Sequence, residues 1–186
     1  MIDPFAPRFG TWRGALRLGL AYAEEASGQA AIVRPNPAQV RRLVFVCHGN
    51  ICRSAYADGL ARRAGKNVTS FGLSTSSGLA AWPLVLDRSL ERGLDLSDHR
   101  TTRIEDYVPQ PGDYLLAMEA RHLRKLAANP KTANLPRGLL GSYASPPVPH
   151  LHDPYQLDPA YMDVCLARIE RAVTGLVKRY PAATAV

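Results

Sequence analysis

The chain has 186 residues, of which 46% are apolar and 21% are charged, and this balance fits one globular domain with a substantial core. The formal charge of +7 divides into +2 over residues 1–41 and +5 over the remainder, which excludes a separate basic arm. The basic residues are scattered rather than interleaved with aromatics along a stripe, so we expect no nucleic-acid partner.

The N-terminal residues 1–29 lack the basic region, long apolar run and small-residue cleavage site of a signal peptide. No stretch of the sequence is long and apolar enough to predict a transmembrane segment. The three cysteines, Cys47, Cys52 and Cys165, are too few and too unevenly placed for a secreted disulfide scaffold. These features predict a cytoplasmic protein.

Residues 1–41 are expected to form an extension ahead of a domain that covers residues 42–186. Trp12, Leu16, Leu20 and Ala23 recur at helical spacing, which predicts an amphipathic helix, and the Pro-rich stretch near residue 35 predicts a linker. Such a helix can dock on the body, pair with a second chain, touch a membrane surface or remain disordered. We favour docking or disorder.

From Arg42 onward the sequence alternates between apolar runs and helical patterns. The run LVFVC ends at a Gly-containing loop and is followed by a helical pattern, and further apolar segments occur at 67–73, 113–119 and 135–141. Helical patterns lie between these segments at 83–93 and 119–129, and a long one closes the chain at 159–180. This alternation predicts a parallel sheet covered by helices.

The loop after the first of these strands has the composition of a phosphate-binding site. It places Cys47, five intervening residues and Arg53 between the end of a strand and the first turn of a helix, where backbone N–H groups and the helix dipole favour an anion. Gly49 allows close approach, Asn50 tolerates a left-handed conformation, and Arg53 can hold two phosphate oxygens at once. The same positive field, with a hydrogen bond from Ser54, favours a nucleophilic Cys47 thiolate.

The segment CHGNICRS, together with the later DPY at 153–155, resembles the low-molecular-weight protein tyrosine phosphatases. The resemblance covers roughly residues 42 to 180 and is carried by further segments in the family's order. These segments are SFGL near residue 70, GLDLSDHR at 93–100, DYLLAMEARHL at 113–123 and LLGSY at 139–143. The resemblance implies a three-layer α/β/α fold with a four-stranded parallel sheet, no metal and no cofactor.

The resemblance also implies roles for individual residues. Cys47 would be the nucleophile, Arg53 would hold the phosphate, and Asp153 would protonate the leaving group and later activate water. Tyr155 would contact the substrate ring. The expected phosphate-binding loop comprises His48, Gly49, Asn50, Ile51, Cys52 and Arg53, and the expected supporting residues are Ser54, Ser70 and His99.

The implied activity is that of a phosphoric monoester hydrolase, specifically a protein-tyrosine phosphatase. It would hydrolyse phosphotyrosine and small aryl phosphates through a phosphocysteine intermediate. The implied partners are tyrosine-phosphorylated proteins. For bacterial members of the family, typical partners are the tyrosine kinases of polysaccharide export.

Several residues keep alternative interpretations. Cys52 either only packs or forms a reversible disulfide with Cys47, whereas Cys165 fits a helix core. His150 and His152 suggest a metal site, but no third ligand accompanies them in the sequence, so loop histidines near an active site are favoured. Trp82 either flanks the substrate ring or belongs to the core.

Rival activities fit the sequence less well. An arsenate reductase of this type needs further redox cysteines after the loop, and residues 53–164 contain none. The related arginine phosphatases carry Thr where this chain has Ile51, and an apolar residue there favours an aromatic substrate. A phosphopeptide-binding module would need neither Cys47 nor Asp153.

Overall fold

The computed structural model describes residues 5–184, so residues 1–4 and 185–186, at the outer ends of the two expected segments, lie outside the described part. The helices are α1 (Ala6–Phe9), α2 (Trp12–Ala26), α3 (Arg53–Arg63), α4 (Pro83–Glu91), α5 (Ala120–Ala128) and α6 (Pro159–Arg179), with short 3₁₀ turns η1 (Pro37–Gln39) and η2 (Leu140–Tyr143). The strands are β1 (Arg42–Cys47), β2 (Val68–Gly72), β3 (Asp113–Ala117) and β4 (Arg137–Leu139).

The four strands form one parallel sheet in the order β2-β1-β3-β4, as the alternating sequence pattern predicts. The last residue of β1, Cys47, pairs with Gly72 of β2, and Val46 pairs with Ala117 of β3. The carboxyl ends of these strands therefore lie at one edge of the sheet, where open parallel sheets bind their ligands.

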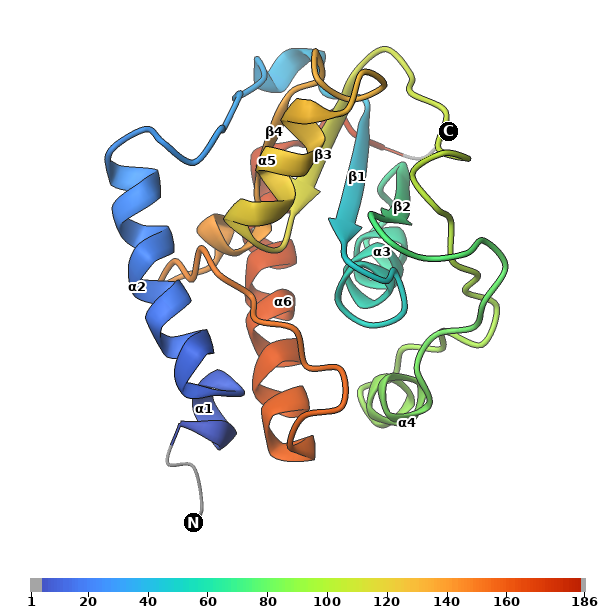
Figure 1. Cartoon of the computed structure of the whole chain (residues 1–186). Coiled ribbons are helices and arrows are strands. Elements are labelled where there is room, and N and C mark those ends of the chain that lie inside the picture. The colour runs from blue at the N-terminus through green and yellow to red at the C-terminus, as the bar shows by residue number, and fades with distance from the viewer. Residues whose placement is uncertain (1–4, 185–186) are drawn as a thin grey trace.

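Helices cover both faces of the sheet, which gives the expected three layers (Figure 1). Leu43 and Phe45 of β1 point into a core shared with α3 and α6, whereas Val44 and Val46 point into a second core shared with α5. This alternation follows from the two-residue period of a strand, and all four side chains are fully buried.

The N-terminal extension lies against the body as two helices, of which α2 is drawn in blue at the left of Figure 1. Three distant points hold it: Arg168 donates to the Arg8 carbonyl at 2.8 Å, Tyr22 donates to the Pro147 carbonyl at 2.5 Å, and Arg124 pairs with Glu24 at 2.9 Å. Docking, one of the two favoured expectations, therefore describes this segment.

The linker after α2 also touches the sheet. Val33 and Arg137 exchange two backbone hydrogen bonds of 2.9 and 2.8 Å, which form an antiparallel bridge on the outer side of β4. The bridge satisfies backbone groups that an edge strand would otherwise leave open. None of the helices in residues 5–184 combines the length and the apolar character that a bilayer crossing requires.

Candidate active site

The phosphate-binding loop leaves β1 at Cys47 and enters α3 at Arg53, over the edge where the carboxyl ends of the strands meet. Asn50 has a φ of 55°, the left-handed conformation that asparagine tolerates better than most residues. Cys47 at the start of this turn is only 2% exposed. The loop thus turns sharply enough to bring its backbone N–H groups over the N-terminus of α3.

Cys47 lies at the base of the loop and receives hydrogen bonds from two directions. Its Sγ is 3.0 Å from Ser54 Oγ and accepts from the Asn50 N–H at 3.2 Å. Because Ser54 Oγ itself accepts from Asn50 Nδ2 at 2.9 Å, the hydroxyl hydrogen is free to point at the sulfur. The buried sulfur is thus within reach of two hydrogen-bond donors, the Ser54 hydroxyl and the Asn50 N–H.

The side chain of Asn50 connects the loop to the rest of the edge. Its amide donates to Ser54 Oγ and to Ser70 Oγ, and its Oδ1 accepts from the Thr102 N–H at 2.9 Å. His99 Nε2 lies 2.8 Å from the Asn50 carbonyl, which can only accept, so this nitrogen carries the proton. The structure therefore brings together all three expected supporting residues, Ser54, Ser70 and His99, around one asparagine.

Arg53 is 1% exposed and is held by carboxylates from two other segments. Its Nη1 donates to Glu119 at 2.7 Å and to the Leu151 carbonyl at 2.9 Å, and its Nη2 pairs with Asp153. Burial alone would lower the pKa of Arg53, but Asp153 and Glu119 outweigh burial and raise it above its ordinary value. Arg53 Nε has no hydrogen-bond partner within residues 5–184, so one donor is left for an oxyanion.

Glu119 is the residue that our sequence analysis missed. It lies two residues beyond the end of β3, which neighbours β1, so its position just after a fully buried strand was the available signal. Burial would raise the pKa of Glu119, but Arg53 and other cationic groups lower it well below the ordinary value. The carboxylate is therefore ionised and fixes the direction of the Arg53 guanidinium.

A pocket of about 240 Å³ opens above the loop. Cys47 and Arg53 line its polar end together with Asp153, and Ile51 and Tyr155 contribute apolar wall. Asp153 Oδ1 accepts from the Tyr155 N–H at 3.3 Å, so the turn itself places the aromatic beside the acid. The structure thus assembles the three expected catalytic residues and the expected ring contact around one cavity.

Of the two alternatives for Trp82, the structure supports packing against the core. Its ring packs edge-on against Tyr155 with centroids 4.7 Å apart, and it also packs against the main core. The backbone N–H of Trp82 donates to the Ile51 carbonyl at 2.9 Å, which ties the loop to the start of α4. Trp82 therefore backs the pocket wall instead of lining the cavity, whose lining residues do not include it.

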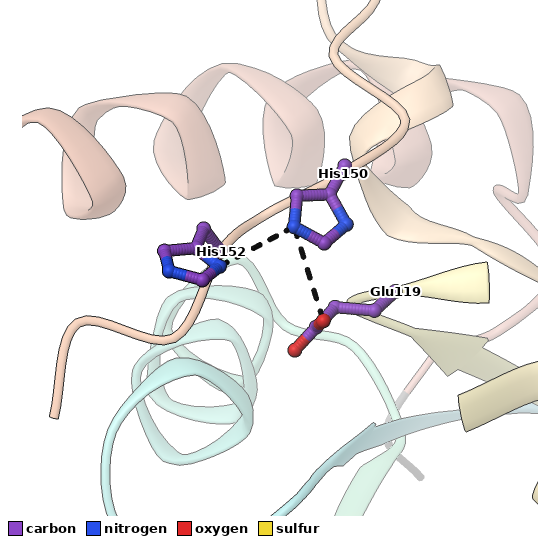
Figure 2. Close-up of side chains that lie close together, drawn as sticks. All are labelled: Glu119, His150 and His152. Atoms are coloured by element: carbon purple, nitrogen blue, oxygen red, sulfur yellow. Dashed lines mark hydrogen bonds and ion pairs between the residues drawn. The ribbon is translucent and has the colours of Figure 1, made fainter. Parts of the chain in front are cut away.

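The two loop histidines gain a third neighbour in the fold. Figure 2 shows His150 and His152 beside Glu119, with ligand atoms of all three within 4.8 Å of one another. The carboxylate of Glu119, however, already pairs with Arg53 at 2.7 Å and with Arg121 at 2.8 Å. A metal ion would have to compete with two guanidinium groups, so we interpret the cluster as part of the scaffold that holds Arg53.

Cys52 and Cys165 are buried free thiols, as is Cys47. Burial raises the pKa of Cys52 well above its ordinary value and that of Cys165 to about 12. Both are therefore protonated near neutral pH, and a disulfide between Cys52 and Cys47 stays a prediction.

The comparisons with known proteins agree with this geometry. Residues 42–184 match the family model described as low molecular weight phosphotyrosine protein phosphatase. The chain is 31% identical over 145 residues to the "probable low molecular weight protein-tyrosine-phosphatase EpsP" of Ralstonia solanacearum, covering 75% of this chain and 96% of that protein.

Solved structures extend the comparison. The tyrosine phosphatase amsI of Erwinia amylovora superposes with a TM-score of 0.67 at 25% identity, covering 78% of this chain and 97% of that one. The YwlE arginine phosphatase of Geobacillus stearothermophilus shares the fold, with a TM-score of 0.63 at 22% identity over 74% and 91% of the two chains. From residue 42 onward the chain belongs to the low molecular weight phosphotyrosine protein phosphatase family.

Proposed function

We propose that this protein is a metal-free protein-tyrosine phosphatase in which Cys47, Arg53 and Asp153 carry out the reaction. The single observation that supports these roles best is the convergence of the three side chains on one pocket, with Cys47 Sγ held by donors at its base. Catalysis of phosphoryl transfer is mostly positioning and charge stabilisation, which an arginine and a ring of N–H groups can supply.

In the first step, Cys47 Sγ attacks phosphorus while Arg53 and the loop N–H groups hold the non-bridging oxygens. The S–P bond forms as the ester P–O bond breaks, and Asp153 gives its proton to the departing phenol oxygen. In the second step, Asp153 takes a proton from water, whose oxygen bonds to phosphorus as the S–P bond breaks. Inorganic phosphate leaves and Cys47 returns as the thiolate.

In the free site, Arg53 forms an ion pair with Asp153. A phosphate dianion would take over Arg53 as its counter-ion, which frees the Asp153 carboxyl to accept and donate protons. Glu119 stays on the other side of Arg53, so the guanidinium keeps its direction when this exchange occurs.

The pocket favours an aryl phosphate over an alkyl one. Next to the phosphate-binding loop the pocket wall is apolar, with Ile51, Leu79 and Tyr155. Burial of a phenyl ring against this wall is favourable. We therefore infer phosphotyrosine as the substrate, tyrosine-phosphorylated proteins as the partners and a cytoplasmic, reducing location that suits three free thiols. Tyrosine kinases of bacterial polysaccharide export are the specific partners that the resemblance suggests.

An arginine phosphatase is the second candidate, because YwlE shares the fold. The apolar Ile51 in the pocket wall is the observation that favours the tyrosine substrate over it.

The deciding experiment measures hydrolysis of matched phosphotyrosine, phosphoserine and phosphoarginine peptides in chelator and reductant. We expect turnover of phosphotyrosine alone and its loss, by about 10⁴-fold or more, in Cys47→Ser. Inorganic phosphate should still bind the folded variant, because Arg53 and the loop N–H groups remain. Faster turnover of phosphoarginine than of phosphotyrosine would show that the protein is an arginine phosphatase. Turnover that persists in Cys47→Ser would show that Cys47 is not the nucleophile.

A further inference from the structure

Helix α2 presents its apolar side to solvent. Trp12, Leu16 and Leu20, at spacings of four residues, are 55%, 55% and 52% exposed. The opposite side of the helix faces the body with small buried residues such as Gly14 and Ala21, and with Leu18, which packs against the main core. Trp12, Leu16 and Leu20 therefore point outward, which is the reverse of a helix that docks through its apolar stripe.

Close packing on the inner side explains this orientation. A Cβ on Gly14 would lie 2.1 Å from the Phe9 carbonyl oxygen and 3.0 Å from the His152 ring, so a larger side chain does not fit there. Thr11 caps the helix by accepting from the Gly14 N–H at 3.0 Å and also contacts His152 Nε2 at 3.2 Å. The inner face is thus closely packed against its surroundings, and Trp12, Leu16 and Leu20 are left outside.

Basic side chains border the exposed stripe. Arg13 stacks its guanidinium over the Trp12 ring at 5.4 Å, and neither Arg13 nor Arg17 has an ion-pair partner within residues 5–184. Arg121 and Arg124 of α5 lie beside Arg17 and Leu20 around a pocket of about 240 Å³, but they already pair with Glu119 and Glu24. Trp12, Leu16 and Leu20, bordered by Arg13 and Arg17, form what we call the outer face of α2.

The size of this face argues against a second copy of the chain as its occupant. Three side chains that are only about half exposed offer a few hundred Å², far below the about 800 Å² that each partner brings to a standard interface. A helix that lies at a lipid surface needs less apolar area than a protein interface. An apolar stripe with Trp and Leu enters the headgroup boundary by about 5–10 Å, and arginines beside the stripe contact anionic headgroups.

We propose that the outer face of α2 binds the surface of an anionic lipid bilayer. The docked α2 then acts as a peripheral anchor for the phosphatase body, independently of the reaction assigned to Cys47. Since Thr11 contacts His152, the residue before Asp153, the anchor would also hold the substrate pocket close to the membrane surface.

Vesicle co-sedimentation tests this proposal with the full chain. Vesicles of phosphatidylcholine with an equal amount of phosphatidylglycerol are compared with vesicles of phosphatidylcholine alone. The buffer contains inorganic phosphate, which occupies the phosphate-binding loop at Cys47. We expect binding to the anionic vesicles only, weakened by added salt, with a shift of Trp12 fluorescence in a Trp82→Phe background.

A double substitution separates the outer face from the rest of the protein. Leu16→Ser with Leu20→Ser should weaken vesicle binding about tenfold or more, while hydrolysis of a small aryl phosphate stays as in the wild type. Leu90→Ser is the matched control, because Leu90 is 66% exposed on α4, and this variant should bind vesicles like the wild type.

Three results would overturn the proposal. The first is no binding to anionic vesicles, and the second is equal binding of the double variant and the wild type. The third is a concentration-dependent dimer, seen by analytical ultracentrifugation, that the double substitution abolishes, which would assign the outer face to a second copy of this chain.

Discussion

The phosphate-binding loop and the N-terminal extension are built on opposite principles. In the loop, buried polar groups satisfy one another, as where Asn50 joins Ser54, Ser70 and Thr102. In the extension, α2 packs through small residues and Leu18, and it leaves Trp12, Leu16 and Leu20 more than half exposed. The loop is specified by many mutually dependent contacts, whereas the outer face of α2 contributes little to folding and is free to serve another purpose.

The contrast has an energetic basis. Removing one partner from a buried network leaves other groups unpaired and costs about 1–3 kcal/mol for each, whereas surface substitutions stay within about 0.5 kcal/mol. The predictions below therefore run from the loop and its acid to the exposed side of the extension.

After the loss of the nucleophile Cys47, the largest effect is expected for the acid beside the loop. Asp153→Asn keeps the shape of the side chain but removes the proton, so hydrolysis of aryl phosphates with weakly acidic phenols should fall by about 10²- to 10⁴-fold. Phosphates of strongly acidic phenols should lose much less, because their leaving groups need no proton. A leaving-group series on both proteins measures this, and an equal loss across the series would exclude Asp153 as the acid.

The next effect concerns Asn50, where the network meets a strained backbone. Asn50→Ala removes its side-chain hydrogen bonds to Ser54, Ser70 and Thr102 and should lower the free energy of unfolding by about 2–4 kcal/mol, with a parallel loss of turnover. Denaturant unfolding measures the change.

The matched variant Asn50→Gly separates the two causes. It loses the same hydrogen bonds but relieves the φ of 55°, so it should recover about 1–2 kcal/mol relative to Asn50→Ala without reaching the wild type. Wild-type stability in both variants would show that the network does not hold the loop.

A third prediction uses the pH dependence of stability beneath the site. Burial lowers the pKa of His150 from 6.5 to about 4, although Glu119 opposes this shift and His152 and Arg53 reinforce it. Between these two pH values the unfolded chain binds a proton that the folded chain does not. Stability should therefore fall as the pH drops from about 6.5 to 4, by up to about 1.4 kcal/mol per pH unit for this group.

His150→Gln tests that assignment. In this variant, unfolding between about pH 7 and pH 4 should take up about one proton fewer than in the wild type, so the free energy of unfolding should fall less steeply with acid. Urea unfolding at a series of pH values measures this slope. Curves that run parallel for the two proteins would show that other groups, such as the more deeply buried His122, carry the acid sensitivity.

The smallest effect is expected on the exposed side of α2. Leu16→Ser should change the free energy of unfolding by no more than about 0.5 kcal/mol, because Leu16 is 55% exposed. Leu18→Ser, two residues along the same helix, should cost about 1–2 kcal/mol, since Leu18 packs against the main core. Comparable losses in both variants would show that the outer face stabilises the fold after all.

Short-range features of the site were predictable because they depend on neighbours in the sequence. Cys47, Arg53 and Ser54 lie within eight consecutive residues, and a strand, a tight turn and a helix N-terminus bring them together whatever the rest of the chain does. The parallel sheet followed from the alternation of apolar runs and helical patterns for the same reason. Asp153 was predictable only through resemblance to a family, because nothing local to it points to Arg53.

Contacts between distant segments were decided by the tertiary structure alone. Glu119 meets Arg53 because β3 neighbours β1 and both strands end at the same edge, a pairing that a sequence of apolar runs does not specify. The helical spacing of Trp12, Leu16 and Leu20 determined that α2 would be amphipathic, but not which side would face the body. That choice belongs to the surface against which α2 packs, where the His152 ring and the Phe9 carbonyl leave room only for glycine.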